Sequence, residues 1–199
     1  MMAFDVHENT SDETLLHMFA TGDKSVARTL VLRHAPGVLA VATRMLKDQS
    51  EAEDVTQETL LRLWKIAPDW KPERAKISTW LYRVAANLCM DRLRKNRGVS
   101  LTLVPELVDE TPSVETQMIT RDRAEALNSA MRDLPTRQRL AITLRHFQEL
   151  SNPKIADIMG TSVEAVESLL ARGRRSLTRS LTCKLASTDD IEDDKGETL

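Results

Sequence analysis

Aromatic, cationic and amide side chains recur at helical spacing within residues 78–96, the stretch STWLYRVAANLCMDRLRKN. Steps of three and four place five of them on one side of a helix: Trp80, Arg83, Asn87, Asp91 and Arg94. An indole ring can stack on an unpaired base, a guanidinium neutralises phosphate, and an Asn amide can read a base edge. This 80–94 row therefore fits a surface for nucleic acid. The same spacing is as typical of a solvated basic helix anchored by one Trp.

A second row lies in residues 51–65, EAEDVTQETLLRLWK. Its members recur at i, i+3, i+4 and i+7, and they are Asp54, Gln57, Glu58 and Leu61. An acidic row with one Leu suits docking against a basic, amphipathic helix of a protein partner. Spacing alone favours the other interpretation, an ordinary solvated face. We call this set the 54–61 row.

No group of residues has the spacing of an active site or a metal centre. Carboxylate-bridged metal sites in helical bundles need a Glu three residues before a His, and none of the four His residues has one. Cys89 and Cys183 are isolated, and neither a nucleophile motif nor a phosphate-binding glycine loop is present. We therefore expect no enzyme activity, metal, cofactor or small-molecule substrate.

The helices that must position these rows are indicated by long 3.6-residue periods, few glycines and no alternating strand pattern, so the chain is predicted to be all-α. A first helix should run from a cap at Ser11 to about Thr21. A second should span about 23–47 and bend or break at Pro36. A capping box at 50–53 should open a third helix that ends near Ile66.

Each row has an apolar face on the opposite side of its helix. In the third helix the inward set is Ala52, Val55, Thr59 and Leu63. In the helix that begins at a Ser78 cap it is Leu81, Val84, Ala85 and Leu88. These faces should pack into one core and leave both rows outside.

Helical periodicity is lost over residues 98–112, GVSLTLVPELVDETP. This stretch has two prolines and no basic residue. We expect a flexible linker between two domains here, because 15 residues without a pattern are long for a packed loop. Further helices are predicted at about 113–133 and 135–147.

The second half contains a sequence typical of a helix-turn-helix. A short helix should start at Asn152 and end at Gly160, which permits the tight turn, and Ser162 should cap a long helix. The long helix carries five basic side chains: Arg172, Arg174, Arg175, Arg179 and Lys184. A basic second helix of this kind fits the DNA major groove, while a helical hairpin without a ligand is the alternative.

The net charge of −2 conceals an asymmetry. Six of the 30 acidic residues and one of the 28 basic residues lie at 189–199, so residues 1–188 carry a formal charge of +3. Such an acidic end is typical of a disordered tail and, less often, of a mimic of nucleic acid. No apolar run reaches bilayer length, and the start MMAFDVHENTSDE is polar, so we expect a cytoplasmic protein without membrane insertion.

Four segments in this order resemble the sigma factors of bacterial RNA polymerase in their small, extracytoplasmic-function (ECF) form of the sigma-70 family. They are EAEDVTQETLLRLWK, STWLYRVAANLCMDRLRK, LPTRQRLAITLRHFQELS and NPKIADIMGTSVEAVESLLARGRRSL. They cover nearly the whole chain outside its two ends, and four motifs in one order are a specific signal.

The resemblance implies two helical domains with different partners. Residues 11–97, after a tail at 1–10, correspond to a region 2-like bundle that binds the clamp of the largest polymerase subunit and melts the −10 element. Residues 113–184, after the linker at 98–112, correspond to a region 4-like domain that binds the −35 duplex and the flap of the second largest subunit. Residues 185–199 form the acidic tail. The family also implies an anti-sigma partner.

The resemblance also implies roles for individual residues. The clamp would contact the 54–61 row, and the unpaired −10 strand would contact Trp70 and Lys71 together with the 80–94 row. The helix-turn-helix at 152–177 would contact duplex DNA through Ser162, Ala165, Glu167, Ser168, Leu169, Ala171, Arg172 and Arg175. Glu167, Leu169 and Ala171 depart from the basic and aromatic residues common at these positions, so the bases that are read do not follow from the sequence.

The sequence is compatible with two other functions. A dimeric helix-turn-helix repressor or activator would account for residues 152–184 but would leave the 54–61 row and the Trp-containing first domain without a role. A helical enzyme would require a cavity with convergent titratable groups. The predicted function is therefore an alternative sigma factor that directs core polymerase to specific promoters.

Overall fold

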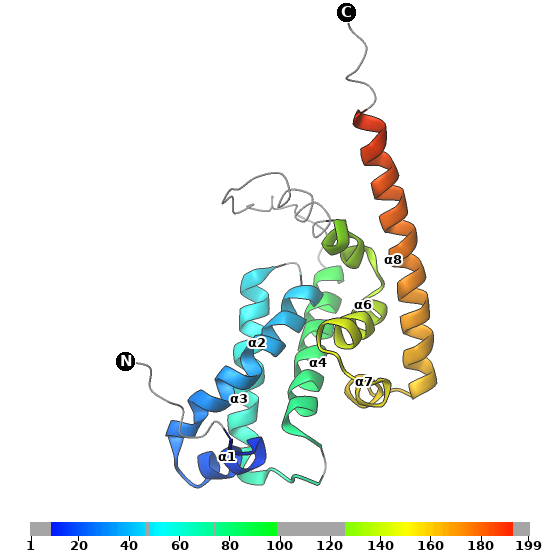
Figure 1. The fold of residues 1–199 in the computed structure, drawn as a ribbon. Coiled ribbons are helices and arrows are strands. Elements are labelled where there is room, and N and C mark those ends of the chain that lie inside the picture. Colours follow the sequence, from blue (N-terminus) through cyan, green and yellow to red (C-terminus); the bar gives the residue numbers. More distant parts are fainter. Residues whose placement is uncertain (1–8, 47, 74, 99–125, 193–199) are drawn as a thin grey trace, which may run out of the picture.

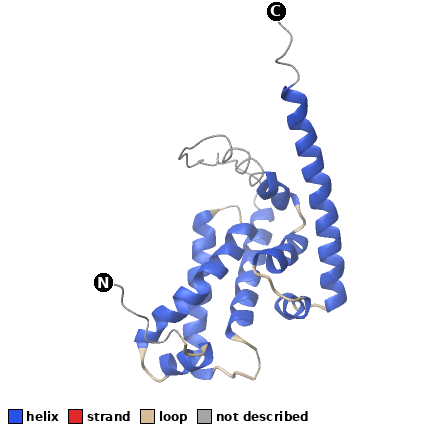
Figure 2. Ribbon diagram, in the orientation of Figure 1, coloured by secondary structure: helices blue, strands red, loops and turns tan. Residues whose placement is uncertain are grey.

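The computed structural model describes residues 9–46, 48–73, 75–98 and 126–192, and within these ranges the chain forms helices and loops but no strand (Figure 2). The all-α prediction is confirmed. The predicted linker beyond Gly98, the start of the helix expected at 113–133 and the last seven residues lie outside the described residues.

The first lobe consists of four α-helices and two short 3-10 helices: α1 (Asp12–Ala20), η1 (Lys24–Val26), α2 (Ala27–Met45), α3 (Gln49–Ile66), η2 (Ala67–Asp69) and α4 (Ile77–Gly98). The predicted cap of α1 is confirmed, because Ser11 Oγ accepts a hydrogen bond from Thr14 N at 3.2 Å. Gly22, with φ of 115°, lets the chain leave α1 in a conformation that other residues rarely adopt.

Two local predictions differ from the structure. Of the bend or break expected at Pro36, the break is absent, because Pro36 lies inside α2, which continues from Ala27 to Met45. Proline removes the hydrogen bond to the carbonyl four residues earlier, that of Leu32, which lies on the exposed side of α2. The cap of α3 is Asp48 rather than Ser50, because the Asp48 carboxylate accepts from Glu51 N at 2.9 Å.

The predicted inward faces form the core of the first lobe. Ala52, Val55, Thr59 and Leu63 are buried in α3, as are Leu81, Ala85 and Leu88 in α4, with Val84 half-buried. The buried hydroxyls in α3 do not lack partners, because Thr56 Oγ1 and Thr59 Oγ1 donate to the carbonyls of Ala52 and Val55. The 54–61 row lies on the other side of α3, and of the 80–94 row only Trp80 packs partly against this core.

The second lobe contains a helix over 126–133, then α6 (Thr136–Ile142), the π-helical turn η3 (Thr143–Phe147), α7 (Asn152–Met159) and α8 (Val163–Glu192). The helix-turn-helix prediction is confirmed for α7 and α8. Gly160 ends α7 in the left-handed conformation, with φ of 58°, and Ser162 Oγ accepts from Ala165 N at 3.2 Å. Ile155, Ile158, Val166 and Leu170 are buried between these helices and α6.

α8 is longer than the sequence predicted. It runs as one helix to Glu192, beyond the boundary expected at residue 184. The first four residues of the acidic segment, 189–192, are therefore helical rather than disordered. The far half of α8 projects away from the other helices (Figure 1).

The two lobes pack directly against each other. α7 contacts α4, while α6 and η3 contact α2. As a result α4 lies between α2 and α3 on one side and the second lobe on the other (Figure 1).

Candidate nucleic-acid and protein interfaces

The 54–61 row lies on the outer side of α3. Leu61 has 64 % of its surface exposed, an unusual value for a large apolar side chain. Asp54 lies 3.8 Å from Arg92 of α4, and Glu58 accepts from Arg62 at 2.6 Å. The row is thus an acidic strip around one exposed leucine.

Leu32 of α2 is 60 % exposed and was not singled out in the sequence. Helical spacing could have identified it, because Leu32 follows Arg28 by four residues and both are exposed on the outer side of α2. α2 and α3 pack against each other. Each of these two helices exposes one leucine, Leu32 on α2 and Leu61 on α3.

Trp70 and Trp80 come together at the start of α4. Their ring centroids lie 5.9 Å apart with an interplanar angle of 89°, an edge-to-face pair. Trp70 ends η2 and donates its backbone N–H to Ala67 O at 3.3 Å, which fixes the loop to the end of α3. Trp70 Nε1 is buried without a hydrogen-bond partner among the described residues, and Lys71 beside it is exposed.

The 80–94 row has a mixed environment. Arg83 donates to Asp157 of α7, while Asn87 is exposed and lines a cavity of about 400 Å³ between α4 and the turn after α7. At the far end of the row Asp91 and Arg94 pair at 2.7 Å in solvent. The second lobe therefore contacts this row at Arg83, while Asn87, Asp91 and Arg94 remain exposed.

The predicted duplex-binding residues lie along the first half of α8. Ser162 caps the helix, Ser168 Oγ accepts from Arg172 Nη2 at 2.7 Å, and Glu167 is 3.5 Å from Asn152 Nδ2. Ala165, Leu169 and Ala171 are half-buried.

The outer face of α8 is basic. Arg172, Arg174, Arg175 and Arg179 are all exposed along two turns of the helix. Glu164 opens the helix, where hydrogen bonds from its own backbone and from Ser162 lower its pKa and keep it charged. This face remains open to solvent in the packed arrangement of the lobes.

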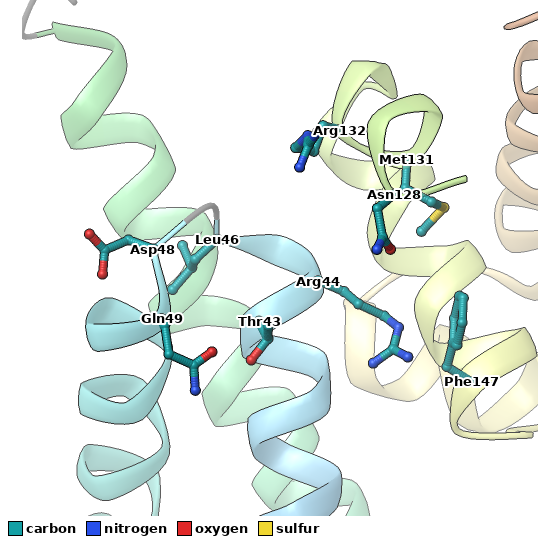
Figure 3. Close-up of a pocket in the computed structure, with 9 residues that line it drawn as sticks. All are labelled: Thr43, Arg44, Leu46, Asp48, Gln49, Asn128, Met131, Arg132 and Phe147. Carbon is teal, nitrogen blue, oxygen red and sulfur yellow. The ribbon is translucent and has the colours of Figure 1, made fainter. Parts of the chain in front are cut away.

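A second cavity of about 400 Å³ lies where α2 and the 126–133 helix meet (Figure 3). The Arg44 guanidinium lies 3.9 Å from the centre of the Phe147 ring, and burial lowers the pKa of Arg44. Sequence reasoning missed this pair, because the two residues are far apart in the chain and belong to no shared period.

Cys89 is a buried thiol of α4. Burial raises the pKa of the Cys89 thiol to about 12, so it stays neutral and unreactive at physiological pH. In the described part of the chain no three His, Cys, Asp or Glu side chains gather as metal ligands. None of its helices is long and apolar enough to span a bilayer.

Two sigma-70 family models match separate parts of the chain. Residues 30–99 match Sigma-70 region 2, and residues 124–177 match Sigma-70 region 4. The chain is 30 % identical to the ECF RNA polymerase sigma factor SigM of Mycobacterium tuberculosis, over 90 % of this chain and 89 % of SigM. It is 32 % identical to the ECF sigma factor SigE of Mycolicibacterium smegmatis, of which it spans 63 %.

Two solved structures have a similar fold. CnrH, solved in complex with the cytosolic domain of CnrY, is 25 % identical and matches with a TM-score of 0.65 over 86 % of this chain and 97 % of CnrH. The sigma factor RpoE of Bartonella quintana, solved with the anti-sigma factor NepR, matches with a TM-score of 0.62 at 23 % identity over 78 % of this chain and 96 % of RpoE. Both sigma-70 regions, their order and their helices are present, so this chain belongs to the ECF sigma factors of bacterial RNA polymerase.

Proposed function

We propose that this sigma factor docks on the clamp of the largest polymerase subunit through the 54–61 row. Leu61 can bury its exposed side chain against a partner helix, while Asp54 and Glu58 pair with basic groups around it. Burial of one leucine contributes about 2 kcal/mol, which is enough to make it the centre of a small interface. Leu32 on the neighbouring helix is a second apolar contact for the same partner.

The corner formed by Trp70 and Trp80 is the proposed site for the unpaired −10 strand. This aromatic pair is the observation that carries the assignment, because the loop and α4 bring two indoles together from separate elements. Stacking of a base on an aromatic ring contributes about 1–3 kcal/mol, which offsets the cost of extruding that base from the duplex. Lys71, Asn87 and Arg94 supply polar and cationic groups along the strand.

The exposed basic face of α8 is the proposed site for the −35 duplex. α7 and α8 have the geometry in which a recognition helix enters the major groove. Arg172 and Arg175 would contact phosphates, and Ser162, at the start of the helix, would approach the DNA first. The same lobe would contact the flap of the second largest subunit.

An anti-sigma factor is the proposed regulator. CnrH was solved with the cytosolic domain of CnrY, and RpoE with the anti-sigma factor NepR, so chains of this fold bind protein partners of that kind. The chain would act in the cytoplasm, where core polymerase and DNA are found, and we assign it no catalytic step of its own.

Reconstitution with core polymerase tests the proposal. The full chain should form a holoenzyme and support initiation at promoters identified by mapping transcript starts. Leu61→Ala should weaken core binding about tenfold, because it removes most of the buried apolar contact. Glu53→Ala, an exposed acid on the same helix outside the row, is the matched control. A wild-type chain that binds promoter DNA but not core would instead be a stand-alone helix-turn-helix regulator.

A further inference from the structure

Glu167 places an exposed acidic side chain in the second turn of α8. This is the part of a recognition helix that reaches base edges in the major groove. Phosphates line both sides of that groove, so a carboxylate there is repelled unless it faces a group that donates a hydrogen bond. The position of Glu167 therefore calls for a donor on the DNA.

Glu164, one turn earlier on the same helix, is an exposed acid in a different setting. Hydrogen bonds from its own backbone and from Ser162 lower its pKa, so its carboxylate is engaged at the start of the helix. Glu167 has no Lys or Arg three or four residues away along α8, and it takes part in no ion pair among the described residues. Its carboxylate is thus not neutralised within the protein.

Asn152, the first residue of α7, is the hydrogen-bond partner of Glu167. Its Nδ2 donates to Glu167 Oε1 at 3.5 Å, across the two helices of the helix-turn-helix. Asn152 is half-buried, and its Oδ1 is buried without a partner among the described residues. Because an unpaired buried amide oxygen is unfavourable, the contact with the carboxylate is what stabilises this orientation of Asn152. The bond is long and uses one oxygen, so it orients the carboxylate and leaves Oε2 able to accept from a ligand.

The chemistry of a carboxylate selects among the bases. It only accepts hydrogen bonds, and the donors in the major groove are N4 of cytosine and N6 of adenine. Guanine and thymine present acceptors at the same edge. Adenine places its acceptor N7 beside N6, where it repels a carboxylate oxygen, whereas cytosine has no acceptor at its major-groove edge. Cytosine is therefore the base that fits.

We propose that Glu167, oriented by Asn152, selects a cytosine in the −35 duplex. This rests on the proposed binding of the −35 duplex by α8, and it adds which base one residue of that helix reads. Asn152 is a positioning residue, because it acts on the base through Glu167.

The preferred duplex can be found without knowing the promoter. Selection from duplexes randomised over about ten base pairs, one helical turn, is carried out with the full chain and with the holoenzyme. Competition titrations then compare the four bases at each enriched cytosine in turn. At one of these positions we expect wild type to favour cytosine about fivefold, the low end for a contact with a base edge.

Glu167→Gln should move this preference from cytosine to adenine, because an amide can bond N6 and N7 together. Such a change of preference cannot come from loss of folding. If Glu167→Gln instead strengthens binding to all four duplexes equally, Glu167 only repels phosphate and the proposal is overturned. A selection that enriches no cytosine overturns it as well.

Two further variants test the positioning and the choice of acid. Asn152→Ala should reduce the cytosine preference to about twofold, and unchanged preferences at the other positions would show that the helix-turn-helix is still folded. A full cytosine preference in this variant would refute the positioning role. Glu164→Gln is the matched control and should keep the wild-type preference at every position. A switch to adenine in Glu164→Gln would assign the contact to the wrong acid and overturn the proposal.

Failure of the proposed function gives a different result. If α8 does not bind duplex DNA, neither the chain nor the holoenzyme enriches any sequence, and both proposals are refuted. If the chain enriches a sequence but forms no holoenzyme, clamp docking is refuted, while the response to Glu167→Gln still decides the role of Glu167. If the holoenzyme initiates and Glu167→Gln leaves the preference unchanged, only the reading of cytosine by Glu167 is refuted.

Discussion

The two proposed DNA-binding surfaces differ in how accessible they are within the same chain. The basic face of α8 is open, with Arg172 and Arg175 in solvent, whereas Arg83 in the 80–94 row on α4 is bound by Asp157 of α7. Duplex DNA is present before transcription starts, while the melted strand appears only after polymerase has engaged the promoter. The accessibility of each surface thus matches the order in which its ligand becomes available.

Arg139→Met removes a hydrogen bond that joins the two lobes, from Arg139 Nη1 to Met45 O. We expect the free energy of unfolding of the second lobe to fall by about 3 kcal/mol, because buried carbonyls lose a charged donor. Thermal or urea unfolding of the full chain measures it. Arg137→Met, an exposed arginine on the same helix, should change little, and equal losses in the two variants would show that Arg139 has no special role.

Trp80→Ala tests the proposed single-strand surface on α4. Promoter opening should fall by about 1–3 kcal/mol, roughly 5- to 150-fold, because a base loses its stacking surface. Permanganate reactivity of unpaired thymines in the holoenzyme complex measures opening, and duplex binding should be unchanged. Trp80→Phe keeps an aromatic ring and should restore most of the opening, so a Phe variant as defective as Ala would contradict stacking.

Gly160→Ala tests the proposed duplex-binding helix-turn-helix through the backbone conformation of its turn. Gly160 has φ of 58° and nothing within 4 Å of an added Cβ, so the cost is conformational rather than steric. We expect about 1 kcal/mol of lost stability and a matching loss of −35 duplex affinity. Gly160→Asn should lose less, because Asn tolerates this conformation, and promoter opening on a pre-melted template should be unaffected by either.

Arg175→Ala should have the smallest effect. Loss of one exposed phosphate contact weakens duplex binding about evenly across sequences and lowers the slope of log affinity against log salt by about 1. Titration of duplex DNA at several salt concentrations gives this slope. Base-dependent loss without a change of slope would mean that Arg175 reads a base edge instead.

The sequence predicted the features that depend on local periodicity and capping. The buried faces of α3 and α4, the Ser162 cap and the Gly160 turn each follow from residues within one or two turns of each other. Whether α2 bends or breaks at Pro36 did not follow from the sequence, because the outcome depends on how far helix packing offsets the local cost of proline. The Asp48 cap was missed because Ser50 offered a similar capping pattern two residues later.

The packing of the lobes could not be predicted from the sequence. Arg83 and Asp157 are 74 residues apart, and Arg139 and Met45 are 94 apart, so no periodic signal links them. Arg83 was assigned to a DNA-facing row by its spacing, and this spacing is compatible with either a phosphate or a carboxylate as its partner. Only the tertiary arrangement distinguishes the two.

The length of α8 separates the charges of the chain from one another. A rigid helix rises about 1.5 Å per residue, so Asp189 is carried about 26 Å along the axis from Arg172. The screening length in physiological salt is about 8 Å, roughly a third of that separation. The helix thus acts as a spacer that isolates the acidic residues 189–192 electrostatically from the recognition face, which keeps its positive potential although the whole chain carries a charge of −2.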